Sequence, residues 1–464
     1  MSPTTSPVRP PKITIIGAGG YVFPFRLIGD VLSFPALRSA QLCLMDVDPG
    51  KLAPVAEAAR KLIAHHGFDA QVVETTDRRS ALDGADFVVI TFQVGGVASY
   101  RHDVEIPRRY GVDQTVGDTV GPGGVFRFLR SVPAYEAIAA DALEVCPDAV
   151  FINYANPMAM ATAFLNARGL RTVGLCHSVQ GTTRMLARTL GVPYEEVDYL
   201  SAGINHQAWI LRFRRRGGED LYPRLREVMT ERHVVGRAAG ELAGDHGDHS
   251  GAAAAASVYE GGNEQVRTTL MNAFGYFETE SSHHASEYLP YFRKDPATVE
   301  RYVPQRWDYY EICAAHDDRG DIDAQLARLQ EELTPSVEYG ASIVNSVVTG
   351  VPSVVYGNVP NATGVIANLP GEACVEVPCL VDANGVQPTA VGELPPQLAA
   401  LNRTNVNVQT LAVRAALTGS REHVFHAVAL DPLTAALLTL EQVRDMTDEL
   451  LAAHADLLPA ALRP

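Results

Sequence analysis

The chain has 464 residues, of which 47% are hydrophobic and 20% are charged, and its formal net charge is −16. This length predicts two or three domains with a large buried core. The acidic balance excludes nucleic acids and anionic membranes as main partners, because both need a basic face on the protein.

The first segment, residues 1–11, is rich in Pro, Ser and Thr, and we expect a disordered tail there rather than a secretory signal. No apolar run reaches the ~20 residues that a membrane helix needs. The six cysteines are scattered, which favours reduced thiols over a disulfide framework. Together these features predict a cytoplasmic protein.

Short apolar runs then alternate with segments of helical periodicity. We expect strands at residues 12–16, 41–46, 71–76, 85–92, 149–157 and 171–178. Continuous apolar strands separated by helices indicate a parallel sheet that is covered on both faces. The predicted fold class is therefore α/β, with a doubly wound, Rossmann-type sheet over residues 12–200 like that of the malate and lactate dehydrogenases.

A glycine-rich turn follows the first of these strands. Gly17 would make the tight turn, and Gly19, with Gly20 beside it, would let the backbone approach a pyrophosphate at the start of the next helix. Val22 stands where a third Gly or Ala is usual, so the fingerprint is incomplete. Asp46 ends the second strand, where an acid bonds the ribose hydroxyls of NAD and repels the phosphate of NADP. Asp46 also suits the N-cap of the next helix, but the two features together favour NAD.

The second half of the chain is less regular. We expect residues 201–464 to form a C-terminal α+β domain that contributes to the substrate and metal site and to oligomerisation. Helical spacing is clear over residues 395–417 and 438–454, which we interpret as packing helices that could meet a second subunit. The segment 244–257 places His246 and His249 beside aspartates, a pattern that either binds metal or is simply solvated.

Four polar motifs stand at strand ends or in loops. They are residues 114–124 around Asp118, residues 153–157 around Asn156, residues 176–180 and residues 203–207. A thiolate and an imidazole at the ends of neighbouring elements can ligate one metal ion, as Cys176 and His206 would. A lone Cys is also often a small core residue, and Asn-Pro is a common turn. Spacing alone therefore indicates no more than a dinucleotide-linked enzyme.

The combination of GAGGYVF, LMDVDP, QTVGDTVGPGG, NYANPM, GLCHSVQG and GINHQAW, in this order, resembles glycoside hydrolase family 4. The C-terminal stretches EVPCLVDANGVQP, LNRTNVNVQTLAVRAALTG and DPLTAALLTLEQV resemble the same family, so the resemblance covers almost the whole chain. Within the family, CHSVQ is similar to the α-galactosidase branch. Members that act on 6-phosphorylated sugars have Asp where this chain has His177, which disfavours a phosphorylated substrate.

This resemblance implies an α-glycosidase, first of all an α-galactosidase, that uses NAD and Mn²⁺ or another divalent transition metal. Most glycosidases work through two carboxylates, and the NAD-dependent family is an exception. The route that the resemblance implies is oxidation at C3 of the sugar, loss of the acidified C2 proton with elimination at C1, addition of water, and return of the hydride. The net reaction is hydrolysis without net formation of NADH.

The resemblance also implies residue roles. Cys176 and His206 would ligate the metal, with the catalytic candidate His177 beside it. Asp118 would protonate the leaving oxygen, and Asn156 would contact the sugar hydroxyls or the cofactor. A thiolate ligand further predicts that activity needs a reductant.

The base that removes the C2 proton falls in the segment 280–291. Tyr288 is the first choice, because a nearby cation lowers the pKa of a phenol from about 10. His284 and Glu287 compete with it for this role.

Other functions stay open at this point. An α-galacturonidase, α-glucuronidase or α-glucosidase of the same family fits the motifs, and Arg101, Arg127 and Arg130 could serve a uronate carboxylate. An NAD-dependent 2-hydroxy-acid dehydrogenase shares the nucleotide domain but needs no metal. A non-catalytic NAD-binding protein is the third alternative. The resemblance predicts a homodimer or homotetramer.

Overall fold

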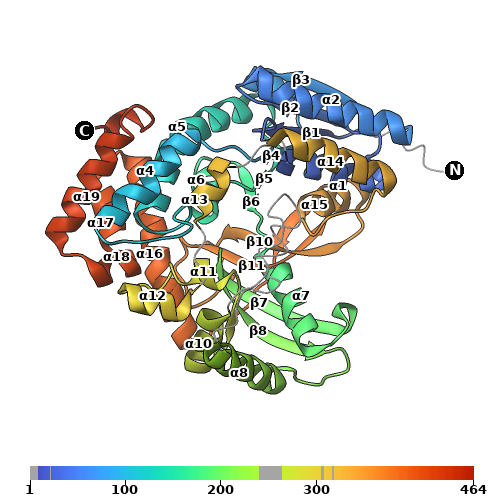
Figure 1. Cartoon of the computed structure of the whole chain (residues 1–464). Helices are drawn as coiled ribbons and strands as arrows, with labels where there is room; N and C mark the ends of the chain where they lie inside the picture. The colour runs from blue at the N-terminus through green and yellow to red at the C-terminus, as the bar shows by residue number, and fades with distance from the viewer. Residues whose placement is uncertain (1–8, 21, 240–263, 305–307, 316–317) are drawn as a thin grey trace.

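The computed structural model describes residues 9–20, 22–239, 264–304, 308–315 and 318–464 (Figure 1). The histidine-containing segment 244–257 lies outside these residues, and so does most of the expected N-terminal tail. Within the described ranges, no helix combines the length and the apolar character needed to cross a bilayer.

The first half of the sheet is parallel and has the order β3-β2-β1-β4-β5-β6. Its strands are β1 (Lys12–Ile16), β2 (Gln41–Met45), β3 (Gln71–Thr75), β4 (Phe87–Ile90), β5 (Val150–Asn153) and β6 (Arg171–Gly174). All six expected strands are present, and their order is that of a doubly wound dinucleotide-binding sheet. The predicted fold class is confirmed.

The sheet continues beyond β6 with antiparallel strands from the second half of the chain. In spatial order these are β10 (Ser353–Pro360), β11 (Cys374–Asp382), β7 (Val197–Ile204), β8 (Gln207–Arg215) and β9 (Phe277–Glu278), with β12 (Gly385–Pro388) paired to β11. The two halves of the chain therefore share one sheet, which the sequence did not predict.

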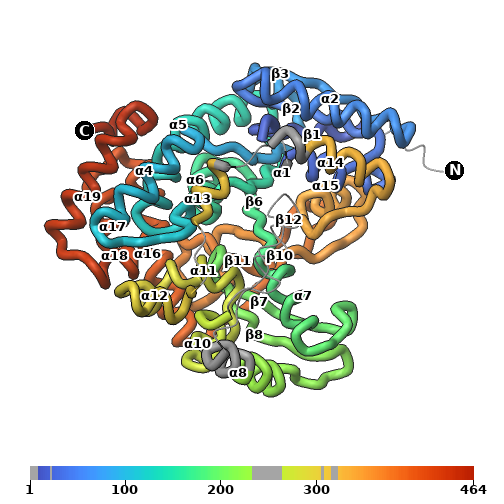
Figure 2. Tube along the Cα trace, viewed as in Figure 1, coloured from blue at the N-terminus to red at the C-terminus, as the bar shows by residue number. Residues whose placement is uncertain are grey.

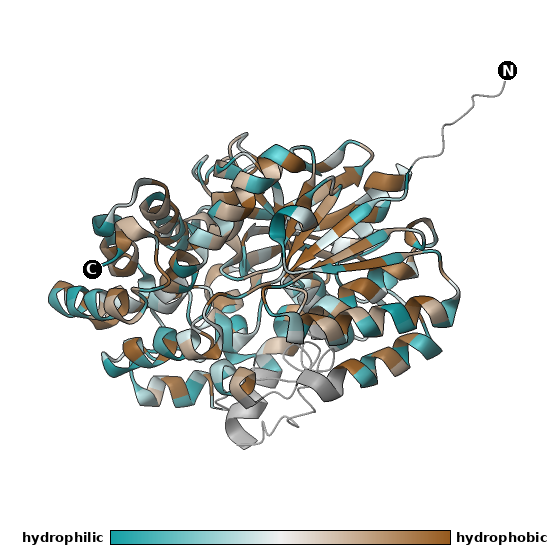
Figure 3. Cartoon of the chain, turned by 90° about the horizontal axis from the view of Figure 1, so that it is seen from above, coloured by the Kyte–Doolittle hydropathy of each residue, from teal (hydrophilic) through white to brown (hydrophobic). Residues whose placement is uncertain are grey.

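Helices cover both faces of the parallel part. Alternate side chains of each strand point to opposite faces, so each strand contributes to two cores. Ile15 of β1 belongs to one core, whereas the next residue, Ile16, belongs to the other. The first core packs α1 (Val22–Ser33), α2 (Pro49–His66), α14 (Asp318–Glu331) and α15 (Gly340–Thr349). The second packs α3 (Arg78–Leu82), α4 (Gly96–Arg109), α5 (Gly121–Val145), α6 (Met158–Ala167), α16 (Pro396–Thr418), α17 (Arg421–Ala429), α18 (Pro432–Leu437) and α19 (Leu440–Ala453). In Figure 3 the strands are largely hydrophobic and lie between helices with mixed faces.

Most of the remaining helices lie near the β7–β8 hairpin, at the end of the molecule opposite β1–β3 (Figure 2). They are α7 (Ser178–Leu190), α8 (Tyr222–Ala239), α10 (Gln265–Phe274), α11 (Ser282–Ala285) and α12 (Pro296–Tyr302). The short helix α13 (Tyr309–Ala315) instead packs against α4. The expected helices over residues 395–417 and 438–454 correspond to α16 and α19. The carboxyl ends of β5 and β6 and the tip of the hairpin thus face one region at the middle of the molecule (Figure 1).

Candidate active site

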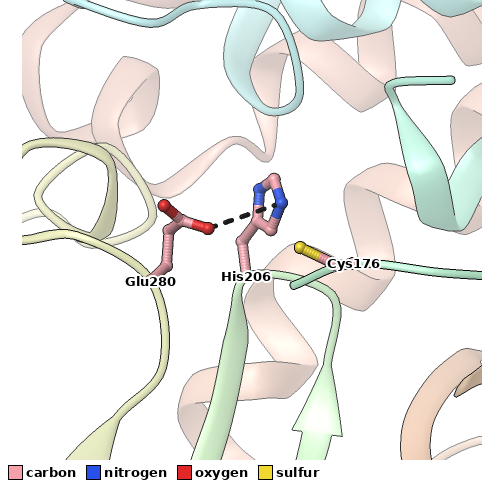
Figure 4. Close-up of side chains that lie close together, drawn as sticks. All are labelled: Cys176, His206 and Glu280. Atoms are coloured by element: carbon pink, nitrogen blue, oxygen red, sulfur yellow. Dashed lines mark ion pairs between the residues drawn. The ribbon is translucent and has the colours of Figure 1, made fainter. Parts of the chain in front are cut away.

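Three potential metal ligands converge in that region from separate segments (Figure 4). Cys176 follows the carboxyl end of β6, His206 lies in the two-residue turn between β7 and β8, and Glu280 follows β9. All three side chains are buried, and one ligand atom from each lies within 4.8 Å of the others. A sulfur, an imidazole nitrogen and a carboxylate oxygen form a donor set that suits a divalent transition metal.

Two of these residues have an unusual backbone. His206 has φ of 62° and Glu280 has φ of 76°, and no other non-glycine residue of the described ranges has a positive φ. Non-glycine residues adopt this conformation rarely, and it persists where the surrounding structure imposes it. The fold therefore holds both backbones in a strained form that directs their side chains to one point.

Burial and mutual charge set the protonation of the trio. Burial raises the pKa of the Cys176 thiol well above its usual value, and Glu280 and Glu376 add to this effect. Burial lowers the pKa of His206 to about 4, although Glu280 opposes the shift. Burial would raise the pKa of Glu280, but the charges of His206 and His284 outweigh it and hold that pKa at about 2. The site thus offers a neutral imidazole and an ionised carboxylate, and the thiol needs a bound cation to ionise.

Asp118 occupies the loop 110–120 between α4 and α5, and it is buried. Thr119 Oγ1 donates to its Oδ1 at 2.6 Å. Arg127 Nη1 lies 3.6 Å from its Oδ2, and Asn156 Nδ2 donates to the same oxygen at 3.5 Å. The structure therefore brings together Asp118 and Asn156, which stand in different motifs of the sequence.

Tyr288 lies beside the trio. Its ring centroid is 6.4 Å from that of His206 and 5.2 Å from that of His284. Its side chain is fully buried, and its hydroxyl has no hydrogen-bond partner among the described residues. Burial, and then the charges of Glu280 and Asp118, raise the pKa of this phenol well above its usual value.

The two competing base candidates are held by other groups. His284 Nε2 lies 2.9 Å from His206 Nδ1, and its Nδ1 lies 3.4 Å from Glu287 Oε2. Glu287 is fully buried and accepts hydrogen bonds from the loop that carries Asp118. Both competitors thus have at least one hydrogen-bond partner, whereas the Tyr288 hydroxyl has none among the described residues.

His177 caps the start of α7, and its Nδ1 lies 3.3 Å from Glu338 Oε1. The Glu338 side chain is 1% exposed, whereas that of His177 is 35% exposed. Burial lowers the pKa of His177, but the bond and the charge of Glu338 outweigh it, so the net shift is upward. His177 therefore presents one edge to the accessible part of the site while Glu338 fixes its other edge.

The sequence reasoning missed Glu280 and Glu338. Glu280 begins the segment 280–291, which was predicted to contain the base, but the sequence did not predict its carboxylate as a metal ligand. Glu338 precedes α15 and carries no motif signal. Asn205, beside His206, was also missed; its buried side-chain amide has no hydrogen-bond partner among the described residues.

The glycine turn lies at the carboxyl end of β1. Gly17 has φ of 93°, and a Cβ there would come within 2.6 Å of the Phe92 backbone nitrogen, so only glycine fits. Gly19 N donates to Asp46 Oδ2 at 2.9 Å. Gly20 is exposed, and a Cβ there would meet nothing closer than 3.5 Å. The turn therefore has an open face beside the acid at the end of β2.

Asp46 does not cap the following helix, so that alternative is wrong. The N-cap of α2 is Asp48, whose side chain accepts from Gly50 N at 2.9 Å and Lys51 N at 3.3 Å. The Asp46 carboxylate instead lies against the glycine turn, where it is half-buried.

Comparison with known proteins gives two family matches. Residues 12–192 match the model for "Family 4 glycosyl hydrolase", and residues 201–434 match that for the "Family 4 glycosyl hydrolase C-terminal domain". An α-galactosidase of Bacillus subtilis is 40% identical over 97% of this chain and 99% of its own length. One of Rhizobium meliloti is 36% identical over 97% of this chain and 89% of its own. The structure of a 6-phospho-α-glucosidase from gut microorganisms, in complex with NAD and Mn²⁺, is 22% identical, with a TM-score of 0.77 over 97% and 99% of the two chains.

Proposed function

Because the chain belongs to family 4 of the glycosyl hydrolases, we propose that it is an α-galactosidase that uses NAD and a divalent metal ion, first of all Mn²⁺. The observation that carries this proposal is the buried trio of Cys176, His206 and Glu280 at the carboxyl edge of a dinucleotide-binding sheet. A 2-hydroxy-acid dehydrogenase needs no such donor set, so the trio argues against that alternative.

The residues at the glycine turn fit NAD. Gly17, Gly19 and Gly20 would hold the pyrophosphate at the start of α1, and Asp46 would receive the ribose hydroxyls. Its negative charge disfavours the additional phosphate of NADP. The strand order reverses between β1 and β4, where ligands of doubly wound sheets bind.

The trio fits a divalent transition metal, because its members supply three different donor atoms and are buried together. When bound, NAD and the cation supply reversible hydride transfer at C3 and polarisation of the neighbouring sugar oxygens. The chain's own residues then position the sugar and move its protons.

Asp118 donates a proton to the leaving glycosidic oxygen, with Thr119 and Asn156 orienting its carboxyl group. Tyr288 would act as the base in its phenolate form, which a cation bound beside His206 would favour by lowering the pKa of this unpaired hydroxyl. His177, fixed by Glu338, orients the sugar hydroxyls beside the metal. Removal of bulk water from these buried groups protects the unsaturated sugar until the controlled addition of one water.

A neutral sugar fits the charges of the site better than a uronate does. Each arginine considered for a carboxylate faces an acidic residue: Arg101 with Glu105 at 2.9 Å, Arg127 with Asp118 at 3.6 Å, and Arg130 with Asp103 at 2.6 Å. The buried Glu338 adds a negative charge beside His177. An anionic group at C6 would therefore find Arg101 and Arg130 already neutralised, which favours a galactoside over a galacturonide or a 6-phosphate.

We also propose a role for each domain, a cellular compartment and an oligomeric state. Residues 12–200 bind NAD, residues 201–464 complete the metal and sugar site, and the enzyme is a homodimer or homotetramer. None of the six cysteines, all of which lie in the described ranges, forms a disulfide, which agrees with a reducing, cytoplasmic location. Light scattering of the purified protein measures its assembly directly.

The central test is hydrolysis of p-nitrophenyl α-galactoside, with NAD⁺, Mn²⁺ and thiol present and each omitted in turn. We expect hydrolysis that stops without the metal, and galactose that carries deuterium at C2 when the reaction runs in D₂O. The matching α-glucoside and α-galacturonide serve as substrate controls. If none of these is cleaved and NADH forms from a 2-hydroxy acid instead, the dehydrogenase alternative replaces the proposal.

A further inference from the structure

Glu287 ties down the loop that carries Asp118. Its Oε1 accepts from Thr115 N at 2.7 Å, Thr115 Oγ1 at 3.1 Å and Val116 N at 2.8 Å. Its Oε2 accepts from Gly117 N at 3.1 Å and Gln114 Nε2 at 3.2 Å. One carboxylate thus satisfies three successive backbone amides, and these charge-assisted bonds are stronger than neutral ones.

The same carboxylate faces the metal site from its other side. Glu287 Oε2 lies 3.4 Å from His284 Nδ1, and His284 Nε2 lies 2.9 Å from His206 Nδ1. His206 Nε2 in turn lies 3.5 Å from Glu280 Oε2. The buried side chains therefore form one row, in the order Glu287, His284, His206 and Glu280.

The contacts along this row have one preferred order of proton donors and acceptors. A carboxylate can only accept, so Glu287 favours the His284 tautomer with its proton on Nδ1. When His284 is neutral, its Nε2 accepts from His206 Nδ1, and His206 Nε2 keeps a free lone pair toward Glu280 and Cys176. A ligating histidine is commonly oriented in this way by a partner on its other nitrogen.

We propose that His284 and Glu287 are positioning residues that couple the metal site to the Asp118 loop, so that metal binding orders residues 114–118. The inference rests on the proposed metal site, but it concerns the loop rather than the reaction. A cation bound to His206 Nε2 polarises the His206 ring and, through it, the His284 ring. The Glu287 carboxylate contacts His284 on one side and the loop amides on the other. Coupling between two sites is reciprocal, so a disordered loop weakens the metal site in turn.

Amide hydrogen exchange of the full-length protein, with Mn²⁺ and with chelator, tests the coupling. We expect Mn²⁺ to slow exchange at Thr115, Val116 and Gly117 by roughly 5–150-fold, the range of typical coupling energies. In His284→Gln, whose Glu287 keeps its bonds to the loop, we expect Mn²⁺ to change exchange less than about twofold. His284→Asn is the second variant in case the first does not fold, and His426→Gln on the exposed face of α17 is the matched control.

Calorimetric titration with Mn²⁺ in the same samples separates the two proposals. If wild-type protein binds Mn²⁺ and its loop exchange does not change, the coupling is overturned while the metal site stands. Equal Mn²⁺ protection in wild type and in a folded His284 variant also overturns it. If wild-type protein binds no Mn²⁺, the metal site fails, and the coupling fails with it. Glycosidase activity does not enter this test.

Discussion

His206 Nε2 and Glu280 Oε2 face each other at 3.5 Å, and each belongs to a residue with positive φ. One residue turns the β7–β8 hairpin and the other follows β9, which pairs with β8. Neighbouring strands therefore bring the two strained positions side by side, and Cys176 approaches from the end of β6. The strain belongs to the part of the fold that we assign to the metal.

Replacement of Glu280 tests its role as the third ligand. Glu280→Gln keeps the size of the side chain and removes its charge, so we expect Mn²⁺ affinity to fall by roughly 10–100-fold or more. Calorimetric titration measures this change. Glu105→Gln, at a partly exposed position of α4, is the carboxylate-to-amide control and should bind Mn²⁺ like the wild type. Unchanged Mn²⁺ affinity in Glu280→Gln would remove Glu280 from the ligand set.

Replacement of Cys176 tests the thiolate. Cys176→Ser should lose more Mn²⁺ affinity than a variant of a residue that contacts only the ligands. Its Co²⁺ complex should lack the thiolate charge-transfer band in the ultraviolet. Cys146→Ser, which alters a buried thiol at the end of α5, should retain the band. Peroxide should abolish the activity of wild-type enzyme. Full activity of the metal-replete enzyme after peroxide treatment would contradict the assignment.

The leaving group tests Asp118 as the general acid. Asp118→Asn should lower kcat by roughly 10²–10⁴-fold on galactosides with an alkyl alcohol as leaving group, because these need protonation. The loss should be far smaller with p-nitrophenol, which leaves without a proton. Asp113→Asn lies in the same loop, but Asp113 faces Arg108 at 3.0 Å, so its effect should not depend on the leaving group. Equal losses on both substrates in Asp118→Asn would argue for a positioning role.

Replacement of each of two neighbouring aspartates tests cofactor selectivity and helix stability separately. Asp46→Ser should weaken NAD binding by about tenfold, the loss of one hydrogen bond to a charged group, and allow NADP to bind. Asp48→Ala should lower the free energy of unfolding by about 1 kcal/mol through loss of the α2 N-cap, without altering the preference for NAD. Fluorescence titration with each cofactor and urea unfolding measure the two effects. An unchanged NAD preference in Asp46→Ser would place the ribose elsewhere.

The pKa of Glu287 predicts an acid-dependent contribution to stability. Burial would raise this pKa, but the bond to His284 and the charges of Arg293 and His284 hold it at about 2, below its ordinary 4.5. A lowered pKa means that the stabilisation is fully present above pH 4.5 and is lost as the pH falls toward 2. Urea unfolding of metal-free wild type and Glu287→Gln should therefore differ most near neutral pH and converge in acid. A difference that does not vary with pH would show that the carboxylate charge is not the cause.

The sequence by itself determined the nucleotide half of the fold and several members of the site. Strand periodicity, the turn at Gly17 and the acid at Asp46 are local signals, because strand alternation and glycine turns depend on neighbouring residues. Cys176 and His206 were visible as ligand types in short motifs, although their spacing alone could not bring them together.

Only the tertiary structure decided which side chains share the site and which are already paired. The approach of Glu280 to His206 depends on the pairing of β8 with β9, and the hold of Glu287 on residues 115–117 depends on contacts between segments far apart in the sequence. The positive φ of His206 and Glu280 is likewise imposed from outside, because neither residue favours it. Long-range pairing, which no local pattern encodes, therefore placed Glu280 beside Cys176 and His206.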